Sequence, residues 1–207
     1  MPYDISNLWS ESIKQFKPYA FATVALNSHK NHFLNPHDAR SKIDDLLRNV
    51  FLRADQEYHG TRNAVRNVPK DQRFEGLIFY EKLDSYPHAH ILLFLPDSIK
   101  GDSTNTKHDE QTRTRFLCHA VHSISLARCE TAKMLLDEKS DDLPRLPAGS
   151  LSAAMDKKSD WDIRPVHDII GLSSYPVKRF SADSRGLNRE AYEPGFLSAF
   201  HSPNQLR

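Results

Sequence analysis

Cysteine is nearly absent from this sequence, whose 207 residues include only Cys118 and Cys129. Two cysteines in a predicted helix do not form the disulfide framework of a small secreted domain, so a reducing, cytoplasmic compartment is expected. The sequence also lacks a signal peptide and any run of about 18 apolar residues. These absences predict a soluble protein that does not associate with a membrane.

The chain also lacks a charge excess of either sign. Lysine and arginine number 28 and aspartate and glutamate 27, which gives a formal net charge of +1. Bulk DNA binding favours a strongly basic surface, so any nucleic-acid contact is expected to be local. Candidates for such a contact are Arg66, Lys70 and Arg73 in one basic segment and Arg179 near the end of the chain. An ordinary solvated surface explains both segments equally well.

No internal repeat, glycine-rich phosphate loop, helicase Walker motif or Ser-His-Asp pattern is recognisable in the sequence. The length predicts a single domain over residues 1–207 with a proper core. Residues 137–160 are rich in Ser, Asp, Lys and Pro and are expected to form a flexible insertion. Residues 182–207 are expected to form an irregular tail.

Hydrophobic periodicity predicts alternating helices and strands. Strands are expected at 19–26, 74–82, 88–95 and 161–166, and helices at 1–18, 36–59, 107–136 and 168–180, with 60–73 as a loop. Asn35 and Pro36 are suited to the N-cap and first turn of the second helix. The order β-α-β-β-α-β predicts an α+β fold, a ferredoxin-like or RRM-like antiparallel sheet with helices packed on it.

The most informative motif is Pro87-His88-Ala89-His90, followed directly by apolar, β-prone residues. Alternate residues of a strand point to one face, so His88 and His90 are expected to project together at the start of a buried strand. Imidazole is the commonest side-chain ligand of divalent metals, and the pair therefore makes half of a metal site. The alternative is that one histidine faces solvent while the other packs.

A second motif lies late in the chain, where Tyr175 and Lys178 are three residues apart in a predicted helix. Residues at this spacing share a helix face. A neighbouring cation favours the phenolate form of tyrosine, which makes it a better nucleophile, and can also hold a phosphate oxygen. Alone, such a pair is equally typical of a tyrosine that packs beside a solvated lysine.

The two motifs together resemble the HUH endonucleases, especially the rolling-circle replication initiators of plasmids and phages. His88-Ala89-His90 matches their His-hydrophobic-His motif, Tyr175 and Lys178 match their Tyr-x-x-Lys motif, and 21–27 loosely match their first motif. The resemblance spans roughly residues 19–181 and implies a sheet that carries the histidines on a central strand. Two departures are the small Ala89 between the histidines and Pro176 directly after the tyrosine.

The resemblance implies a metal-dependent, single-stranded DNA endonuclease and strand transferase. Tyr175 would form a 5′-phosphotyrosyl intermediate, and Lys178 would contact the phosphate or the phenolate. The implied metal is Mg²⁺ or Mn²⁺, held by His88 and His90. The implied partners are single-stranded or hairpin DNA at a replication origin and a host helicase and polymerase. A transposase or relaxase of the same type is an alternative.

Two histidines need a third ligand, and the strand that forms a hairpin with theirs is the expected source. Glu81 is favoured because it ends that strand, across the turn from His88, and because the family often supplies an acid or amide there. An exposed hairpin charge is the alternative interpretation of Glu81. Other possible ligands are Glu75, Asp84, His59 and Asp38.

Rival interpretations remain open on the sequence alone. A zinc site is one alternative, with Cys118, His119, His122 and Cys129 as ligands, although their spacing matches no common zinc finger. A noncatalytic RRM-like nucleic-acid binder would stack bases on Phe79, Tyr80 and Phe94, which are equally good core residues. A structural homologue with a vestigial site is the third alternative.

Overall fold

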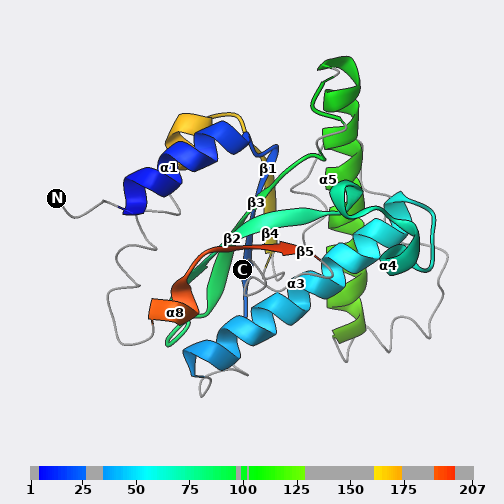
Figure 1. Ribbon diagram of the computed structural model, residues 1–207. Helices are drawn as coiled ribbons and strands as arrows, with labels where there is room; N and C mark the ends of the chain where they lie inside the picture. Colours follow the sequence, from blue (N-terminus) through cyan, green and yellow to red (C-terminus); the bar gives the residue numbers. More distant parts are fainter. Residues whose placement is uncertain are drawn as a thin grey trace.

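The computed structural model describes residues 5–26, 35–96, 99–101, 103–128, 161–173 and 189–198. Within these residues, the chain forms an α+β fold with one open, five-stranded antiparallel sheet (Figure 1). The strands are β1 (Ala20–Ala25), β2 (Glu75–Glu81), β3 (His88–Leu93), β4 (Trp161–Pro165) and β5 (Gly195–Ser198). Their order across the sheet is β4-β1-β3-β2-β5, so the histidine-bearing strand β3 is central.

The connections follow the predicted order β-α-β-β-α-β. The helix α3 (Pro36–Tyr58) connects β1 to β2, and α5 (Ser103–Arg128) lies between β3 and β4. Each neighbouring pair of strands is antiparallel, so β3 is inserted between the mutually parallel β1 and β2. This is the split arrangement of a ferredoxin-like sandwich. The predicted fold class is therefore confirmed, and β5 adds a strand beside β2.

The helix α3 begins as the sequence predicts. Asn35 is its N-cap and accepts a hydrogen bond from the backbone N–H of Asp38, while Pro36 occupies the first turn. Proline is tolerated there because that backbone nitrogen has no partner within the helix. The helix ends at Tyr58, and Gly60 follows with a φ of +62° in the left-handed region.

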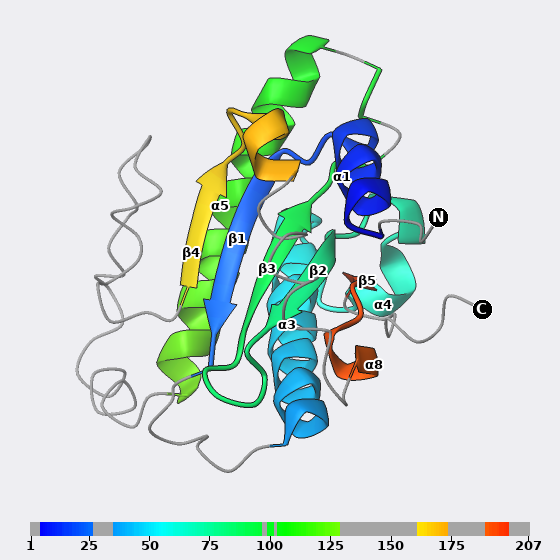
Figure 2. The same cartoon turned by 90° about the vertical axis from the view of Figure 1, so that its left-hand side faces the viewer.

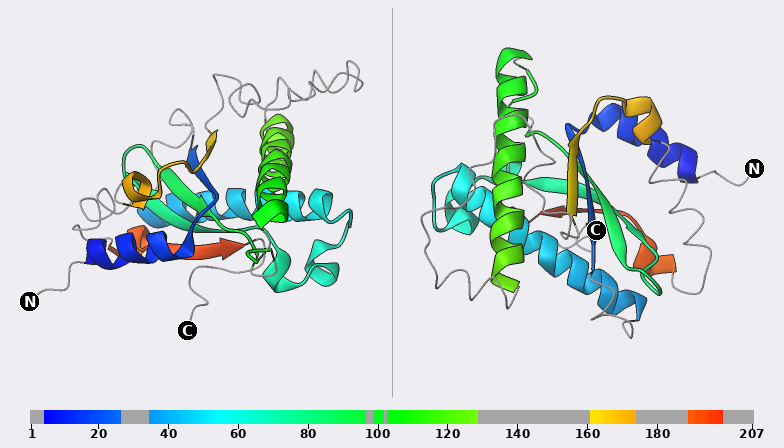
Figure 3. Two further views of the ribbon diagram at one scale, coloured as in Figure 1. Left: turned by 90° about the horizontal axis from the view of Figure 1, so that it is seen from above. Right: turned by 180° about the vertical axis from the view of Figure 1, so that it is seen from behind.

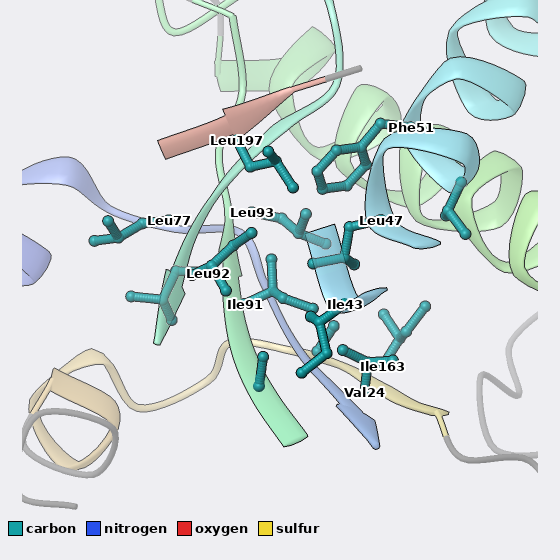
Figure 4. Packing of buried hydrophobic residues seen from close by; sticks show 14 of the residues in the cluster. Val24, Ile43, Leu47, Phe51, Leu77, Ile91, Leu92, Leu93, Ile163 and Leu197 are labelled. Carbon is teal, nitrogen blue, oxygen red and sulfur yellow. The ribbon is translucent and has the colours of Figure 1, made fainter. Parts of the chain in front are cut away.

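Helices α3 and α5 cover one face of the sheet (Figure 2). The apolar face of α3 packs against residues of the sheet that alternate with the histidines along the strands (Figure 4). This core includes Ile43, Leu47, Phe51, Val24, Ile91, Leu93 and Ile163, all nearly inaccessible to solvent. Burial of such side chains stabilises the fold by about 1.5–3 kcal/mol each.

The helix α1 (Ile5–Phe16) lies on the other face of the sheet, beside the short helical segment 169–173 (Figure 3). A hydrogen bond from the Ser10 hydroxyl to Ser173 Oγ, 3.2 Å long, joins the two segments. At its C-terminal end, α1 packs the Phe16 ring edge-on against Phe94 and Phe196, at 5.9 and 5.7 Å between centroids. This is the face that carries the histidines.

The prediction of a loop at 60–73 is wrong in part. The short helix α4 (Ala64–Asn67) and a 3₁₀ turn (Lys70–Gln72) lie within it. Asn63 caps α4 by accepting a hydrogen bond from the Arg66 backbone N–H. A single helical turn is too short to give a periodic hydrophobic pattern, so the polar composition of this segment concealed it.

The prediction of an irregular tail at 182–207 is wrong for residues 189–198. They form α8 (Arg189–Tyr192) and β5, which pairs with the outer edge of β2. Both elements are only four residues long, so neither shows a recognisable period. The predicted insertion at 137–160 lies outside the described residues, as do positions 174–180 of the predicted helix 168–180.

A candidate metal centre on the central strand

The hairpin of β2 and β3 places three polar side chains on one face of the sheet. Glu81 lies directly opposite His88 in the register of the two strands, and His90 lies opposite Phe79. Because side chains alternate along a strand, His88 and His90 project to the same side as Glu81. The structure thus brings together the three residues that the sequence predicted as ligands.

The three side chains converge at hydrogen-bonding distance. Glu81 Oε2 is 3.0 Å from His88 Nε2, and Glu81 Oε1 is 3.3 Å from His90 Nε2. The carboxylate therefore bridges the two imidazoles, with one oxygen directed at each. One ligand atom from each residue lies within 4.8 Å of the others, and this is the one such group of three among the described residues.

The opposite nitrogen of each imidazole is held by a separate partner. His88 Nδ1 lies 2.8 Å from the carbonyl oxygen of Tyr86, which can only accept, so Nδ1 donates. His90 Nδ1 lies 3.0 Å from the hydroxyl oxygen of Thr23, its register partner on β1. Hydrogen bonds at Nδ1 orient metal-binding histidines and leave Nε2 as the ligand atom. Both Nε2 atoms face Glu81.

The site is buried and contains one carboxylate. The side chain of Glu81 is fully inaccessible to solvent, and those of His88 and His90 are 10% and 5% exposed. Burial raises the pKa of the Glu81 carboxyl, but hydrogen bonds and charges from His88 and His90 outweigh it and hold the pKa at about 2. Glu81 is therefore ionised at any ordinary pH.

These contacts fit a divalent cation. A lone pair of His88 Nε2 facing a carboxylate oxygen is unfavourable, so a proton or a cation belongs between them. Two ligand atoms at about 2.1 Å from one ion and at right angles are about 3.0 Å apart, which is close to both observed separations. The group Glu81, His88 and His90 could therefore bind a metal ion.

The other ligands considered from the sequence lie elsewhere. Glu75 and Asp84 are exposed, Asp38 lies in the first turn of α3 and accepts a hydrogen bond from the Asn35 side chain, and the imidazole of His59 contacts the carbonyl of Gln72. The predicted zinc alternative also finds no support in the described part of the chain. Among the described residues, Cys118, His119 and His122 do not form a group of three side chains that could hold a metal ion. Cys129 lies outside the described residues.

Three predicted site residues, Tyr175, Lys178 and Arg179, lie outside the described residues. The described segment that precedes them, 161–173, ends at Ser173, whose hydroxyl oxygen accepts a hydrogen bond from Ser10 of α1.

The basic residues predicted to bind DNA differ from one another. Arg66 and Lys70 are exposed, but they precede β2, whereas Glu81 ends it, so about 20 Å of strand separates them from the site. Arg73 is only 8% exposed and donates hydrogen bonds to the carbonyl oxygens of Val68 and Val65. The guanidinium of Arg73 thus holds α4 in place, and the expectation that it faces a nucleic acid is wrong.

Sequence reasoning did not find the roles of Thr23 and Tyr86. Thr23 reaches His90 through the pairing of β1 with β3, which joins residues far apart in the chain. Tyr86 acts through its backbone carbonyl, which no side-chain motif reveals. A threonine within a strand that carries the first motif was the available signal for Thr23, and Tyr86 had none.

No protein-family model, curated protein or solved structure matches this chain. None of the helices in the described part of the chain is long and apolar enough to span a membrane. The molecule is thus an α+β protein with an antiparallel sheet and a buried Glu-His-His group able to hold a metal ion.

Proposed function

We propose that this protein is a metal-dependent endonuclease and strand transferase of the HUH type, acting on single-stranded DNA. The observation that carries the proposal is the convergence of Glu81, His88 and His90 on the central strand, with both Nδ1 atoms bonded elsewhere. The resemblance of Tyr175 and Lys178 to the Tyr-x-x-Lys motif supplies the nucleophile. The proposed biological role is initiation of rolling-circle replication of a plasmid or phage.

In the proposed reaction, the Tyr175 hydroxyl attacks the phosphorus of a phosphodiester in line with the bond to the 3′ oxygen. A bond forms between the phenolic oxygen and the 5′ phosphate as the bond from phosphorus to the 3′ oxygen breaks. The proton lost by the phenol is transferred to the leaving 3′ oxygen, which becomes the 3′ hydroxyl. The phosphodiester energy is kept in the tyrosyl ester, so a 3′ hydroxyl can reverse the step and join strands.

The remaining groups assist by charge and position. A divalent cation, Mg²⁺ or Mn²⁺, would supply Lewis acidity to the scissile phosphate when bound to Glu81, His88 and His90. Thr23 and the Tyr86 carbonyl each form a hydrogen bond with one imidazole ring. These bonds keep both Nε2 ligand atoms in position. Lys178 would neutralise charge on the phosphate.

The proposed substrates are single-stranded or hairpin DNA at a replication origin. A host helicase and polymerase would supply the unwinding and synthesis. Arg66 and Lys70 are exposed and remain proposed DNA contacts distant from the metal centre. The 3′ hydroxyl released by Tyr175 would prime synthesis.

The test is covalent capture of DNA. The protein is incubated with Mn²⁺ and a 3′-end-labelled pool of single-stranded and hairpin DNAs, and then resolved on a denaturing gel. A labelled adduct is expected with wild type and is expected to disappear with Tyr175→Phe, with His88→Ala and with EDTA. Tyr86→Phe is the matched control, because it removes the phenolic hydroxyl of a tyrosine whose ring lies 5.9 Å from that of His88 and keeps the ring.

The outcomes separate the competing roles. An adduct that persists in Tyr175→Phe but is lost in Tyr86→Phe would move the nucleophile to Tyr86. If no adduct forms with any DNA of the pool although the protein binds DNA, the proposed enzymatic function is wrong and the protein is a noncatalytic binder.

A further inference from the structure

Four rings form a row along the histidine-bearing face of the sheet. Phe21 stacks on His90, with centroids 5.2 Å apart and an interplanar angle of 21°. His90 and His88 meet edge-on at 5.5 Å, and Tyr86 lies 5.9 Å from His88 at 50°. The proposed metal centre is therefore bracketed by an aromatic ring on each side.

The two outer rings differ in exposure from the other aromatic side chains of these strands. Tyr86 is 47% exposed, and Phe21 is half-buried. Phe79, Tyr80 and Phe94 are buried, so the interpretation that these three stack bases is wrong. Within the described residues, the aromatic surface at this site comes from Phe21 and Tyr86.

An exposed charged pair lies next to Phe21. Its register partner on the edge strand β4 is Arg164, whose side chain is 74% exposed and whose Nε is 2.7 Å from Asp162 Oδ2. Exposed ion pairs of this kind contribute little to stability and exchange readily. Arginine is suited to contact a phosphate, although the carboxylate of Asp162 reduces the local positive charge.

Rings that lie on a sheet face beside a cationic group are characteristic of sites for single-stranded nucleic acid, where bases stack on aromatic side chains. We propose that Phe21 and Tyr86 stack bases on either side of the phosphate that a cation bound to Glu81, His88 and His90 would hold. The nucleotide stacked on Phe21 places its own phosphate toward Arg164. This inference rests on the proposed function and adds the subsites that position the substrate.

Stacking of this kind recognises the presence of a base more than its identity, because every base has a π-face. The protein is therefore expected to bind a DNA backbone that carries bases more tightly than the same backbone without them. The ratio of the two affinities isolates the contribution of stacking, because both backbones make the same phosphate contacts.

The experiment compares two fluorescein-labelled oligonucleotides of about 12 residues, oligothymidylate and its fully abasic analogue. Affinities are measured by anisotropy in EDTA, so that neither cleavage nor a metal contributes. Wild type is expected to favour the base-bearing strand, and loss of either ring in Tyr86→Leu or Phe21→Leu is expected to weaken thymidylate binding by about 5- to 100-fold. Abasic binding is expected to change little.

Two further sets of variants separate stacking from folding. Tyr86→Phe and Phe21→Tyr keep the rings and are expected to retain the preference. Phe16→Leu removes a 40% exposed ring that packs on Phe94 and Phe196, and it is expected to leave the preference unchanged. Thermal melting of each variant shows whether it is folded.

The preference ratio decides the inference whether or not the adduct forms. A ratio that falls toward one in both leucine variants supports stacking, even if the covalent adduct is never seen and the enzymatic proposal fails. A wild-type protein that binds both strands equally, or leucine variants with an unchanged ratio, would overturn it. If an oligouridylate RNA of equal length binds more tightly than oligothymidylate, the proposal that the ligand is DNA is wrong.

Discussion

Thr23 Oγ1 lies 3.0 Å from His90 Nδ1, although the two residues belong to strands separated by a long stretch of chain. They are register partners in the β1–β3 pairing, so the sheet itself sets this contact. The hydroxyl restrains the ring of His90 while Nε2 faces Glu81. The first predicted strand thus contributes an outer partner to the candidate metal centre.

Replacing that hydroxyl is expected to weaken metal binding without unfolding the protein. Thr23→Val keeps the branched shape but removes the hydrogen bond, and loss of an outer-shell partner lowers metal affinity by about 10- to 100-fold. The measurement is a calorimetric titration with Mn²⁺. Thr112→Val, at a partly exposed position of α5, is the matched control, because its hydroxyl donates to the carbonyl of His108 on the same helix. Equal affinity of the two variants would contradict the assigned role of Thr23.

A second expectation concerns Asp55, a fully buried carboxyl on α3. Burial raises its pKa to about 7, although a hydrogen bond from the Phe74 backbone N–H and the charges of Arg113 and Arg73 oppose the rise. The unfolded group has a pKa of about 3.9. The folded state therefore retains the proton over a range in which the unfolded state has lost it.

The sign follows from this difference. Between about pH 4 and pH 7, the folded state binds more protons than the unfolded state at this residue, so stability falls as the pH rises. The loss is at most about 4 kcal/mol at 1.36 kcal/mol per pKa unit. Asp55→Asn is expected to gain stability relative to wild type from pH 5 to pH 8 in urea unfolding. Asp45→Asn, an exposed change on the same helix, is the control.

A constant difference between wild type and Asp55→Asn across that pH range would contradict the raised pKa of Asp55. A pH-dependent difference in the Asp45→Asn control would show that the effect does not come from burial.

The close packing of β2 against β3 gives a third expectation. A Cβ added at Gly76 would lie 2.6 Å from Ile91 Cγ2 and 3.1 Å from the Leu92 carbonyl oxygen. Gly76→Ala is therefore expected to reduce the free energy of unfolding by about 1–3 kcal/mol through overpacking. Gly101→Ala meets nothing within 4 Å and is the control. Chemical denaturation measures both, and equal midpoints would contradict the observed packing.

The sequence predicted the parts of the fold that depend on local pattern. The apolar runs at 74–82 and 88–95 located the β2–β3 hairpin, and the hairpin in turn placed Glu81 opposite His88. Asn35 and Pro36 located the start of α3. These inferences succeeded because periodicity and capping involve residues near one another in the chain.

Features that depend on distant packing were not predictable in the same way. The basic segment around Arg73 did not reveal that this one guanidinium turns inward to the carbonyls of Val65 and Val68. The apolar and aromatic run of β2 did not reveal that Phe79 and Tyr80 are both buried. The strand β5 has four residues and is recognised by its pairing with β2.

The most direct test of the central claim is a titration with Mn²⁺ followed by electron paramagnetic resonance, which reports the free ion. Wild type is expected to bind one ion at Glu81, His88 and His90. His88→Ala and Glu81→Gln are expected to lose affinity by more than the 10- to 100-fold of an outer-shell change. His108→Ala, an exposed histidine of α5, is expected to bind as wild type does.

Thermal melting establishes that each variant is folded before the comparison is made. Stoichiometric binding by wild type and His108→Ala, with loss in His88→Ala and Glu81→Gln, is the result expected of a metal centre on the central strand. Unchanged binding in the latter two variants, or no binding of Mn²⁺ by folded wild type, would contradict it.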